Sequence, residues 1–188
     1  MTALMNLVGV VMGLLLAIVA GLLQPTMAVP TLGGLSLVEL PTSGQLAAVL
    51  LTALICGARV GLMTAVAYLA FGLTQFPVFH AGGGPDYVLE PGFGYLLGLI
   101  PGAWLVGRIG QQVALRDPFS LWFAALTGVV VVSLCGGAYL LLGAVVGHWS
   151  MPWPELMVSH WLLPLLLQAV MACPVAVAAA LLRRLLLY

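Results

Sequence analysis

The residues with the greatest chemical potential gather in one polar stretch, Phe76–Gly98, which separates two long hydrophobic runs. The stretch holds His80, the acidic residues Asp86 and Glu90, and a glycine triplet at positions 82–84. Glycine lets a backbone come close to a ligand and can present several N–H groups to an anion. A flexible turn would have the same composition, so the triplet by itself leaves both interpretations open. The stretch as a whole predicts a recognition loop beside a small-molecule site.

Hydrogen-bonding and aromatic side chains that could line such a site recur in the neighbouring segments. Small-ligand pockets are mostly apolar and carry a few placed polar groups, which matches this inventory. We expect the ligand to contact Gln45, Tyr68, Gly82, Gly83, Gly84, Tyr87, Tyr95 and Gln168. The same outer face is predicted to include His80, Glu155 and His160.

The serines, acids and histidines form no pattern typical of an enzyme. The serines lack a nucleophile-elbow sequence, HExxH is absent, and every acidic residue is predicted in a loop or at an interface. The three cysteines stand alone in apolar runs, which disfavours a metal site or a disulfide. We expect no catalysis, metal or cofactor, and two alternatives stay open. A membrane enzyme would need Glu155 and His160 to converge on Ser159, and a purely structural bundle would need no site at all.

The elements that position these residues are expected to be membrane helices, because the composition is too apolar for a soluble surface. Of 188 residues, 63% are hydrophobic and 5% are charged, with no lysine, whereas a soluble domain has about 25% charged residues. The formal net charge is zero and the arginines are scattered, so nucleic-acid binding, which needs cationic clusters, is not expected. The composition predicts a multi-pass protein of the plasma (inner) membrane, surrounded by lipid.

Six apolar segments can be drawn, and each should be helical because lipid offers no partner to open backbone groups. They cover residues 5–23, 45–57, 60–76, 92–110, 120–146 and 157–182. All five arginines fall at one side, which the positive-inside rule makes cytoplasmic, and four of the five acids fall at the other. Trp149, Trp153 and Trp161 predict an aromatic belt at the outer boundary. The fold class is therefore an all-α membrane protein, a single domain over residues 1–188 with six transmembrane helices and both termini cytoplasmic.

The first helix carries small residues at a strict four-residue spacing, namely Gly9, Gly13, Ala17 and Gly21. In membranes such a stripe lets two helix backbones approach closely. The stripe indicates either packing inside this bundle or docking of a separate membrane subunit, and the sequence does not choose between them.

The connection over residues 24–44 is long, and its prolines and glycines exclude a helix. Long connections without regular structure are often lids or binding loops. Leu35, Val38 and Leu40 predict that this capping loop folds back onto the bundle, on the same face as the recognition loop.

Residues Gln45–Gly98 resemble the BioY family, the biotin-specific substrate-binding subunits of energy-coupling-factor transporters. The family has a glutamine opening helix 2, an arginine–x–glycine turn, a tyrosine in helix 3, a proline–valine–phenylalanine step, a glycine run and a P-x-x-G-Y-L-x-G entry to helix 4. The matching residues are Gln45, Arg59-Val60-Gly61, Tyr68, Pro77-Val78-Phe79, Gly82-Gly83-Gly84 and Pro91-Gly92-Phe93-Gly94-Tyr95-Leu96-Leu97-Gly98. The spacing matches without gaps over roughly a third of the chain.

This resemblance implies a subunit that captures biotin from outside, and it adds Phe79 and Gly94 to the expected ligand contacts. It implies that the stripe of the first helix docks on a transmembrane coupling protein driven by ATPase subunits, or that the protein works as a homo-oligomer. Residues 24–44 would be the lid over the ligand. Asp86 and Glu90 are expected to be solvated or to anchor the loop, because the carboxylate of biotin would avoid them.

The last helix departs from the family pattern, which has an aspartate and, three residues later, a lysine near the ligand. Residues 164–180 contain neither, and Gln168 is their only strongly polar side chain. A ureido ring can still bond to Gln45 and Gln168, and a carboxylate can use backbone N–H groups, His80 or His160. The departure leaves open another small vitamin or a lipoate-like molecule as the ligand.

Overall fold

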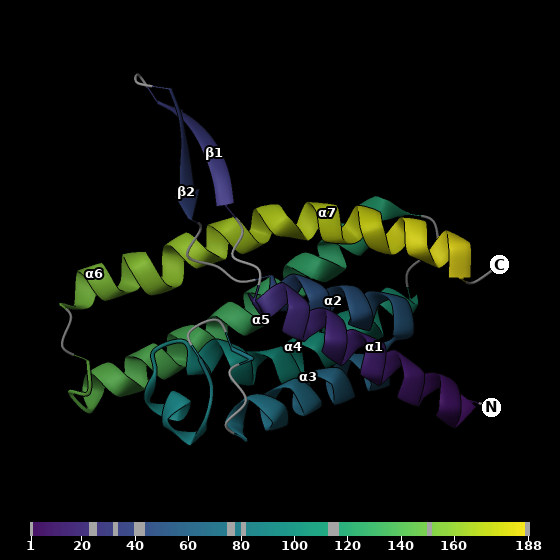
Figure 1. Ribbon diagram of the computed structural model, residues 1–188, viewed down its shortest axis with the longest axis horizontal. Helices are drawn as coiled ribbons and strands as arrows, with labels where there is room; N and C mark the ends of the chain where they lie inside the picture. The colour runs from purple at the N-terminus through teal and green to yellow at the C-terminus, as the bar shows by residue number, and fades with distance from the viewer. Residues whose placement is uncertain are drawn as a thin grey trace.

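The helices of the chain run broadly along one direction in the computed structural model (Figure 1). They are Thr2–Leu22 (α1), Gln45–Cys56 (α2), Ala58–Leu73 (α3), Phe93–Gln112 (α4), Pro118–Val145 (α5), and the joined elements Trp153–Met157 (α6), Val158–Leu162 (the π turn η2) and Leu163–Leu186 (α7). The structure describes residues 2–22, 26–31, 34–39, 44–74, 78–79, 82–112, 117–149 and 152–186. The predicted all-α, six-helix class is confirmed, and the last helical unit begins at Trp153, four residues earlier than expected.

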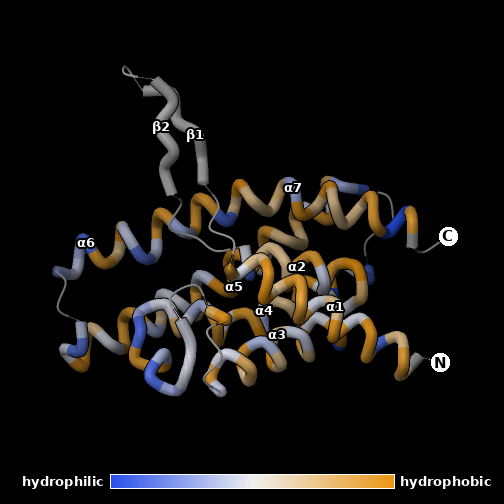
Figure 2. The backbone as a smooth tube through the Cα atoms, in the orientation of Figure 1, coloured by the Kyte–Doolittle hydropathy of each residue, from blue (hydrophilic) through white to orange (hydrophobic). Residues whose placement is uncertain are grey.

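Four helical units are long and apolar enough to cross a membrane: Ala3–Leu22, Phe93–Gln112, Pro118–Val145 and Trp153–Leu185. The remaining two, α2 and α3, are shorter apolar helices. Gly57 joins them with a φ of 90°, which lets the chain reverse within a single residue. Figure 2 shows hydrophobic residues along the helices and hydrophilic ones towards the two ends of the molecule.

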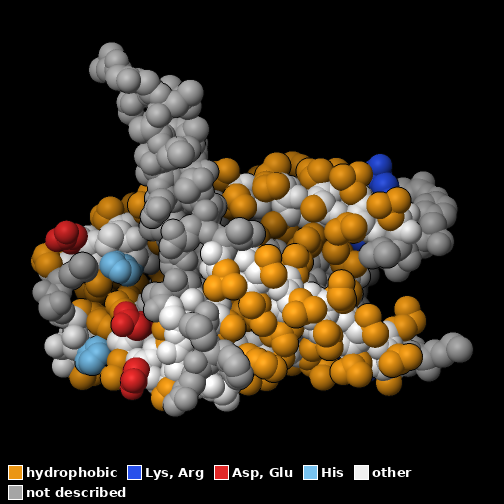
Figure 3. Space-filling view, viewed as in Figure 1, with side chains coloured by type: hydrophobic (Ala, Val, Ile, Leu, Met, Phe, Trp, Pro, Cys, Tyr) orange, Lys and Arg blue, Asp and Glu red, His pale blue; other side chains and the backbone are white. Residues whose placement is uncertain are grey.

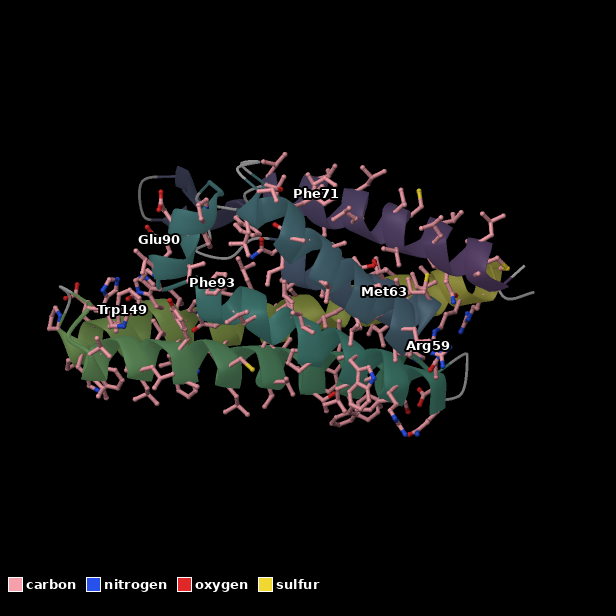
Figure 4. All side chains as sticks on the ribbon, turned by 90° about the horizontal axis from the view of Figure 1, so that it is seen from below. Arg59, Met63, Phe71, Glu90, Phe93 and Trp149 are labelled. Carbon is pink, nitrogen blue, oxygen red and sulfur yellow. The ribbon has the colours of Figure 1, made fainter. Side chains whose placement is uncertain are left out.

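Charge is separated between the two ends of the bundle. On the face seen in Figure 3, acidic and histidine side chains lie at the end that holds α6, and arginine side chains lie at the opposite end. Figure 4 places Glu90 and Trp149 at the first, acidic end and Arg59 at the second, arginine end. Both chain termini lie at the arginine end (Figure 1). This arrangement agrees with the predicted topology, in which the acidic end faces outward.

The core of the bundle is built around α2, which contacts α1, α3, α4 and α7. Leu50 and Leu54 of this helix are almost fully buried. Small residues bring its neighbours close, because a Cβ atom added at Gly61 of α3 would lie 2.5 Å from the Cβ of Ala53. Close backbone approach of this kind is the usual packing mode of membrane helices.

Arg183 joins three helices at the arginine end. Its side chain is 4% exposed, its Nε lies 2.8 Å from the carbonyl oxygen of Leu54, and its Nη2 lies 2.8 Å from that of Gly110. Both carbonyls belong to last turns, of α2 and α4, where no N–H group of the helix can reach them and the helix dipole is negative. One guanidinium of α7 therefore satisfies the ends of two other helices.

The connection between α1 and α2 differs from the predicted irregular lid. Thr26–Thr31 (β1) and Gly34–Glu39 (β2) pair as an antiparallel hairpin, from Thr26 opposite Glu39 to Thr31 opposite Gly34. The pairing gives this segment regular structure, and its predicted fold back onto the bundle stays a prediction. Two six-residue segments with β-branched and apolar residues can satisfy their backbone groups by pairing with each other. Leu40 lies outside the described residues.

A short 3-10 helix, Pro85–Leu89 (η1), interrupts the connection between α3 and α4 at the acidic end. It follows an isolated bridge between Phe79 and Gly82. The recognition loop predicted for this stretch therefore has local structure of its own, which fixes the residues discussed next.

Candidate ligand-binding site

A hydrogen-bonded relay connects three segments at the acidic end. Gln45 opens α2, Tyr68 lies towards the end of α3, and Val78 follows α3. The Tyr68 hydroxyl lies 2.7 Å from Oε1 of Gln45 and 2.8 Å from the carbonyl oxygen of Val78. Tyr68 is fully buried, whereas Gln45 is half-buried. Gln45 and Tyr68, which are 23 positions apart, are brought together because α2 and α3 reverse direction at Gly57.

The two contacts of the Tyr68 hydroxyl bear on the orientation of the Gln45 amide. One hydroxyl proton cannot serve two acceptors. Both contacts are satisfied if the amide NH₂ of Gln45 donates to the hydroxyl oxygen while the hydroxyl donates to the Val78 carbonyl, which is the alternative placement of the amide nitrogen and oxygen. The amide oxygen of Gln45 then faces away from Tyr68 as a free acceptor. The relay therefore suits a ligand that offers an N–H group.

Aromatic rings extend the relay towards η1. The rings of Tyr68 and Phe79 meet edge to face with centroids 5.5 Å apart, and those of Phe79 and Tyr87 are 4.8 Å apart. Phe79 is 2% exposed and rests on Gly72, where a Cβ would lie 2.0 Å from the ring. Burial, with the Glu90 carboxylate as a second cause, raises the pKa of Tyr87, so its hydroxyl stays a neutral donor. The structure thus brings together four of the predicted contact residues.

The glycine triplet is a structured turn rather than an open anion cradle. Gly82 and Gly84 have φ angles of 121° and 102°, which only glycine adopts without strain. The Gly82 N–H donates to the Phe79 carbonyl at 3.1 Å and the Gly84 N–H to the Gly72 carbonyl at 2.7 Å. Two of the three N–H groups are therefore engaged within the protein. Gly83 is exposed, and its neighbours His80 and Pro77 lie outside the described residues.

Tyr95 and Gly94 occupy positions between helices. The Tyr95 hydroxyl donates to the carbonyl of His160 in η2, and its ring lies against Gly136 of α5. Gly94 accommodates Tyr139 of α5, since a Cβ there would lie 2.3 Å from the Tyr139 Cβ. The Tyr95 hydroxyl is thus engaged with the protein backbone, and the contact of Tyr95 with a ligand stays a prediction.

Tyr139 is a residue that sequence reasoning missed. Its hydroxyl donates to the Val88 carbonyl of η1, and its ring lies 5.9 Å from that of Phe93 and 6.2 Å from that of Trp149. It therefore holds η1, and with it Tyr87, against α5. The only signal in the sequence was a tyrosine in an otherwise apolar helix.

Gln168 lies on α7, separate from the relay. Its Oε1 is buried and has no hydrogen-bond partner among the described residues. No hydrogen bond in that part of the chain joins it to Gln45 or Tyr68. A buried acceptor without a partner costs free energy, and a ligand that donates to this oxygen would remove that cost. Gln168 therefore stays a predicted ligand contact.

Ser159, His160 and Glu155 do not form a catalytic arrangement. The Ser159 hydroxyl donates to the backbone carbonyl of Glu155 at 2.6 Å and lies 2.8 Å from Nδ1 of His160. Because the hydroxyl proton is committed to that carbonyl, the serine oxygen accepts from Nδ1–H. An activated nucleophile needs the opposite direction, with the histidine accepting the proton. The Glu155 side chain is exposed and has no role in this contact.

The small-residue stripe of α1 is covered inside the bundle. Cβ atoms added at Gly9, Gly13 and Gly21 would lie 3.1 Å, 2.5 Å and 2.8 Å from side chains of α2 or α3, and Ala17 is fully buried. This packing favours the first of the two interpretations, in which the stripe contacts this chain's own helices, and docking of a partner subunit through the stripe stays a prediction. The exposed side of α1 carries large apolar residues instead, such as Met5, Met12 and Leu15.

The comparison with known families settles which family this fold represents. A sequence model of the BioY family matches residues 1–187. The chain belongs to the BioY family. The relay of Gln45 and Tyr68 and the ring of Phe79 thus lie in a BioY-family protein, at the residues that carried the resemblance in the sequence.

Two relatives in the BioY family align with about half or more of the chain. The "Probable biotin transporter BioY" of Lysinibacillus sphaericus is 32% identical over 100 residues, which is 53% of this chain and 51% of that protein. The "Biotin transporter BioY" of Thermotoga maritima is 26% identical over 119 residues, which is 62% of this chain and 69% of that protein. The alignment therefore spans about half the length of the first relative and two thirds of the second.

A solved structure has the same fold. The crystal structure at 2.1 Å of the S-component for biotin from an ECF-type ABC transporter matches with a TM-score of 0.74, covering 97% of this chain and 92% of that chain at 20% identity. At this identity the likeness establishes the fold. With its apolar helices, the BioY-family chain is a multi-pass membrane protein.

Proposed function

We propose that this chain is the membrane-embedded substrate-binding component of a biotin uptake transporter, and that it captures biotin at the acidic end. The observation that carries the proposal is the relay of Gln45, Tyr68 and Val78 within a BioY-family fold. With the amide nitrogen of Gln45 placed towards Tyr68, the amide oxygen is left as acceptor, and the cyclic urea of biotin offers N–H groups. Phe79 and Tyr87 supply apolar surface for the ring system, as small-ligand sites require.

The whole chain would serve as one binding domain of the plasma membrane and not as an enzyme. It has no nucleotide-binding glycine motif, so energy for uptake would come from a separate transmembrane coupling protein with ATPase subunits. A homo-oligomer is the alternative assembly. Purification of the tagged chain from membranes, followed by identification of co-purifying ATPases, distinguishes the two.

Another small vitamin or a lipoate-like molecule is the second candidate ligand, and one observation favours it. Residues 163–182 of α7 contain no charged side chain, so this helix offers no cation to the carboxylate of biotin. The unpartnered Oε1 of Gln168 would accept a hydrogen bond from either kind of ligand.

Equilibrium binding of labelled biotin to the purified protein in detergent tests the proposal. We expect saturable binding that unlabelled biotin displaces and that Gln45→Ala and Tyr68→Phe each weaken about tenfold, the effect of one hydrogen bond in a buried site. Ser120→Ala is the control, because its hydroxyl contacts only the Asp117 carboxylate at the other end of the molecule.

A competition panel of vitamins and lipoate then separates the two ligands. Displacement by another vitamin at lower concentration than biotin would assign the site to that vitamin. Absence of any binding in the micromolar range, with the protein shown to be folded, would reject a capture role for this site.

A further inference from the structure

The last helical unit is interrupted by a π turn at the acidic end. Within η2 the N–H of Leu163 bonds to the carbonyl of Val158, five residues earlier instead of four. The next residue, Pro164, has no N–H group. The carbonyl four residues before it, that of His160, therefore lacks the donor that a regular α-helix would supply.

Tyr95 of α4 provides the missing donor. Its hydroxyl donates to the His160 carbonyl. The ring reaches that position across Gly136 of α5, where a Cβ would lie only 2.5 Å from ring carbon atoms. The environment of the His160 carbonyl thus depends on three helices. Pro164 of α7 removes a donor, Tyr95 of α4 supplies one, and Gly136 of α5 leaves room for the tyrosine ring.

A second aromatic donor holds the same turn. Trp161 of η2 donates from Nε1 to the Ser133 carbonyl of α5 at 2.9 Å. Its indole crosses Gly137, where a Cβ would lie 2.8 Å from Nε1. The π turn is therefore bonded on one side to α4 and on the other to α5.

We propose that Pro164 and Tyr95 form one positioning device that sets the orientation of α6 and η2 at the acidic end, where the proposed binding site lies. The proline releases the His160 carbonyl, and the tyrosine captures it. One residue of an α-helix corresponds to about 100° of rotation and 1.5 Å of rise. Closing the π turn to a regular helix would therefore rotate the segment Trp153–Val158 by about 100° relative to α7. Tyr95 is a positioning residue, and the binding part of this inference rests on the proposed function.

A double-mutant cycle measures the device by itself. In SDS-induced unfolding of the purified protein, we expect Tyr95→Phe to lower the folded-to-unfolded ratio about tenfold, because a half-buried carbonyl loses its donor. In a Pro164→Ala background, an N–H at position 164 can reach that carbonyl, and the same change should cost less than about twofold. Equal losses in both backgrounds would overturn the proposal.

Tyr139→Phe is the matched control for the cycle. It removes a hydroxyl that also crosses between elements, to the Val88 carbonyl of η1, but Val88 is remote in sequence from Pro164. Its cost should be the same with and without Pro164→Ala. A dependence on Pro164 as large as that of Tyr95→Phe would show that the proline acts on the whole acidic end and not on one carbonyl.

Biotin binding gives a readout that a merely stabilising contact would not change. We expect Pro164→Ala to keep or raise the folded fraction and yet weaken biotin binding by about tenfold or more, because α6 and η2 are rotated. Unchanged binding by this folded variant would overturn the positioning role. If the parent protein itself binds no biotin, the proposed function fails, while the unfolding cycle still tests the device.

Infrared spectroscopy tests the same bond if Pro164→Ala does not fold. In protein labelled with ¹³C at the histidine carbonyls, Tyr95→Phe should shift one labelled amide band to higher frequency, as expected for a carbonyl that loses a donor. Tyr139→Phe should leave the labelled bands in place. Absence of a shift in Tyr95→Phe would overturn the proposal.

Discussion

Replacement of Gly21 by alanine tests whether α1 supports the ligand-binding relay. A Cβ at this position would lie 2.8 Å from the Tyr68 hydroxyl, 3.1 Å from the Val78 carbonyl oxygen and 3.6 Å from Oε1 of Gln45. The first distance is 0.6 Å shorter than the 3.4 Å at which ordinary contact begins (3.4 − 2.8). Tyr68 is fully buried and the Val78 oxygen is a backbone atom, so neither can move aside freely.

The free-energy terms favour a larger effect on binding than on folding. Overpacking of a buried site costs about 1–3 kcal/mol, and replacing glycine by alanine in a helix returns up to about 1 kcal/mol. The net change in unfolding free energy should therefore be about 0–2 kcal/mol. If the methyl group separates Tyr68 from Gln45, binding loses about one hydrogen bond, which is about 1–2 kcal/mol or ~5- to 30-fold in Kd.

The assay is the biotin dissociation constant of Gly21→Ala compared with that of Gly9→Ala. Both variants add one methyl group to the same stripe of α1. A Cβ at Gly9 meets Val60 at 3.1 Å and Cys56 at 3.5 Å, far from the relay. We expect Gly9→Ala to bind biotin like the parent and Gly21→Ala to bind it more weakly, with both proteins folded.

Two results would refute this reasoning. Equal Kd values for Gly21→Ala and the parent, in a preparation where Tyr68→Phe does weaken binding, would mean that α1 moves aside and does not support the relay. Loss of cellular uptake in Gly9→Ala with unchanged binding would instead favour partner docking through the stripe.

Three further changes test other parts of the structure. Arg183→Met should lower the unfolding free energy by about 3 kcal/mol, because the carbonyls of Leu54 and Gly110 lose the buried cation that donates to them, and SDS titration measures this. Asp117 caps α5, and the hydroxyl of Ser120 is the chief cause that lowers the pKa of its carboxyl group. The ionised carboxylate therefore stabilises the folded protein above the usual pKa range of aspartate, and this stabilisation is lost as the pH falls through the lowered pKa. The deficit of Asp117→Ala should accordingly be present at neutral pH and vanish in acid. Ser159→Ala should change the biotin Kd by less than about twofold, since its hydroxyl bonds only within its own turn.

The sequence predicted those parts of the fold and site that follow from composition and from local pattern. Apolar runs located α1 to α5 and α7, because lipid requires each run to satisfy its own backbone. Gln45, Tyr68 and Phe79 were expected at the site, and the structure brings them together. Their exact pairing was not predictable, because it depends on how the turn at Gly57 aligns α2 with α3.

What the sequence left open or misread concerns groups whose role depends on a neighbour far away in the chain. The stripe of α1 could face either a partner or α2 and α3, and only the packing favours one of them. The hairpin of β1 and β2 was read as irregular because its prolines and glycines were weighed more heavily than its capacity to pair. Tyr95 was expected to contact the ligand, and nothing near it in sequence shows that its hydroxyl also bonds to the carbonyl of His160.

The aromatic residues of the acidic end show why such roles are invisible in a sequence. Trp149 and Trp161 were predicted as an interfacial belt, yet both donate to backbone carbonyls of α5, at Leu140 and Ser133. Each indole crosses a glycine of that helix, where a Cβ would lie within 3 Å of the ring. The glycines of α5 alone indicate only a smooth helix, and the tryptophans alone only an interface. The pairing of Trp161 follows from the antiparallel packing of α5 against η2 and α7, and the same packing seats Tyr95, whereas Trp149 folds back onto the end of α5 after the turn at Gly147. The acidic end is therefore held by aromatic donors that cross glycines, which makes its geometry sensitive to single methyl groups.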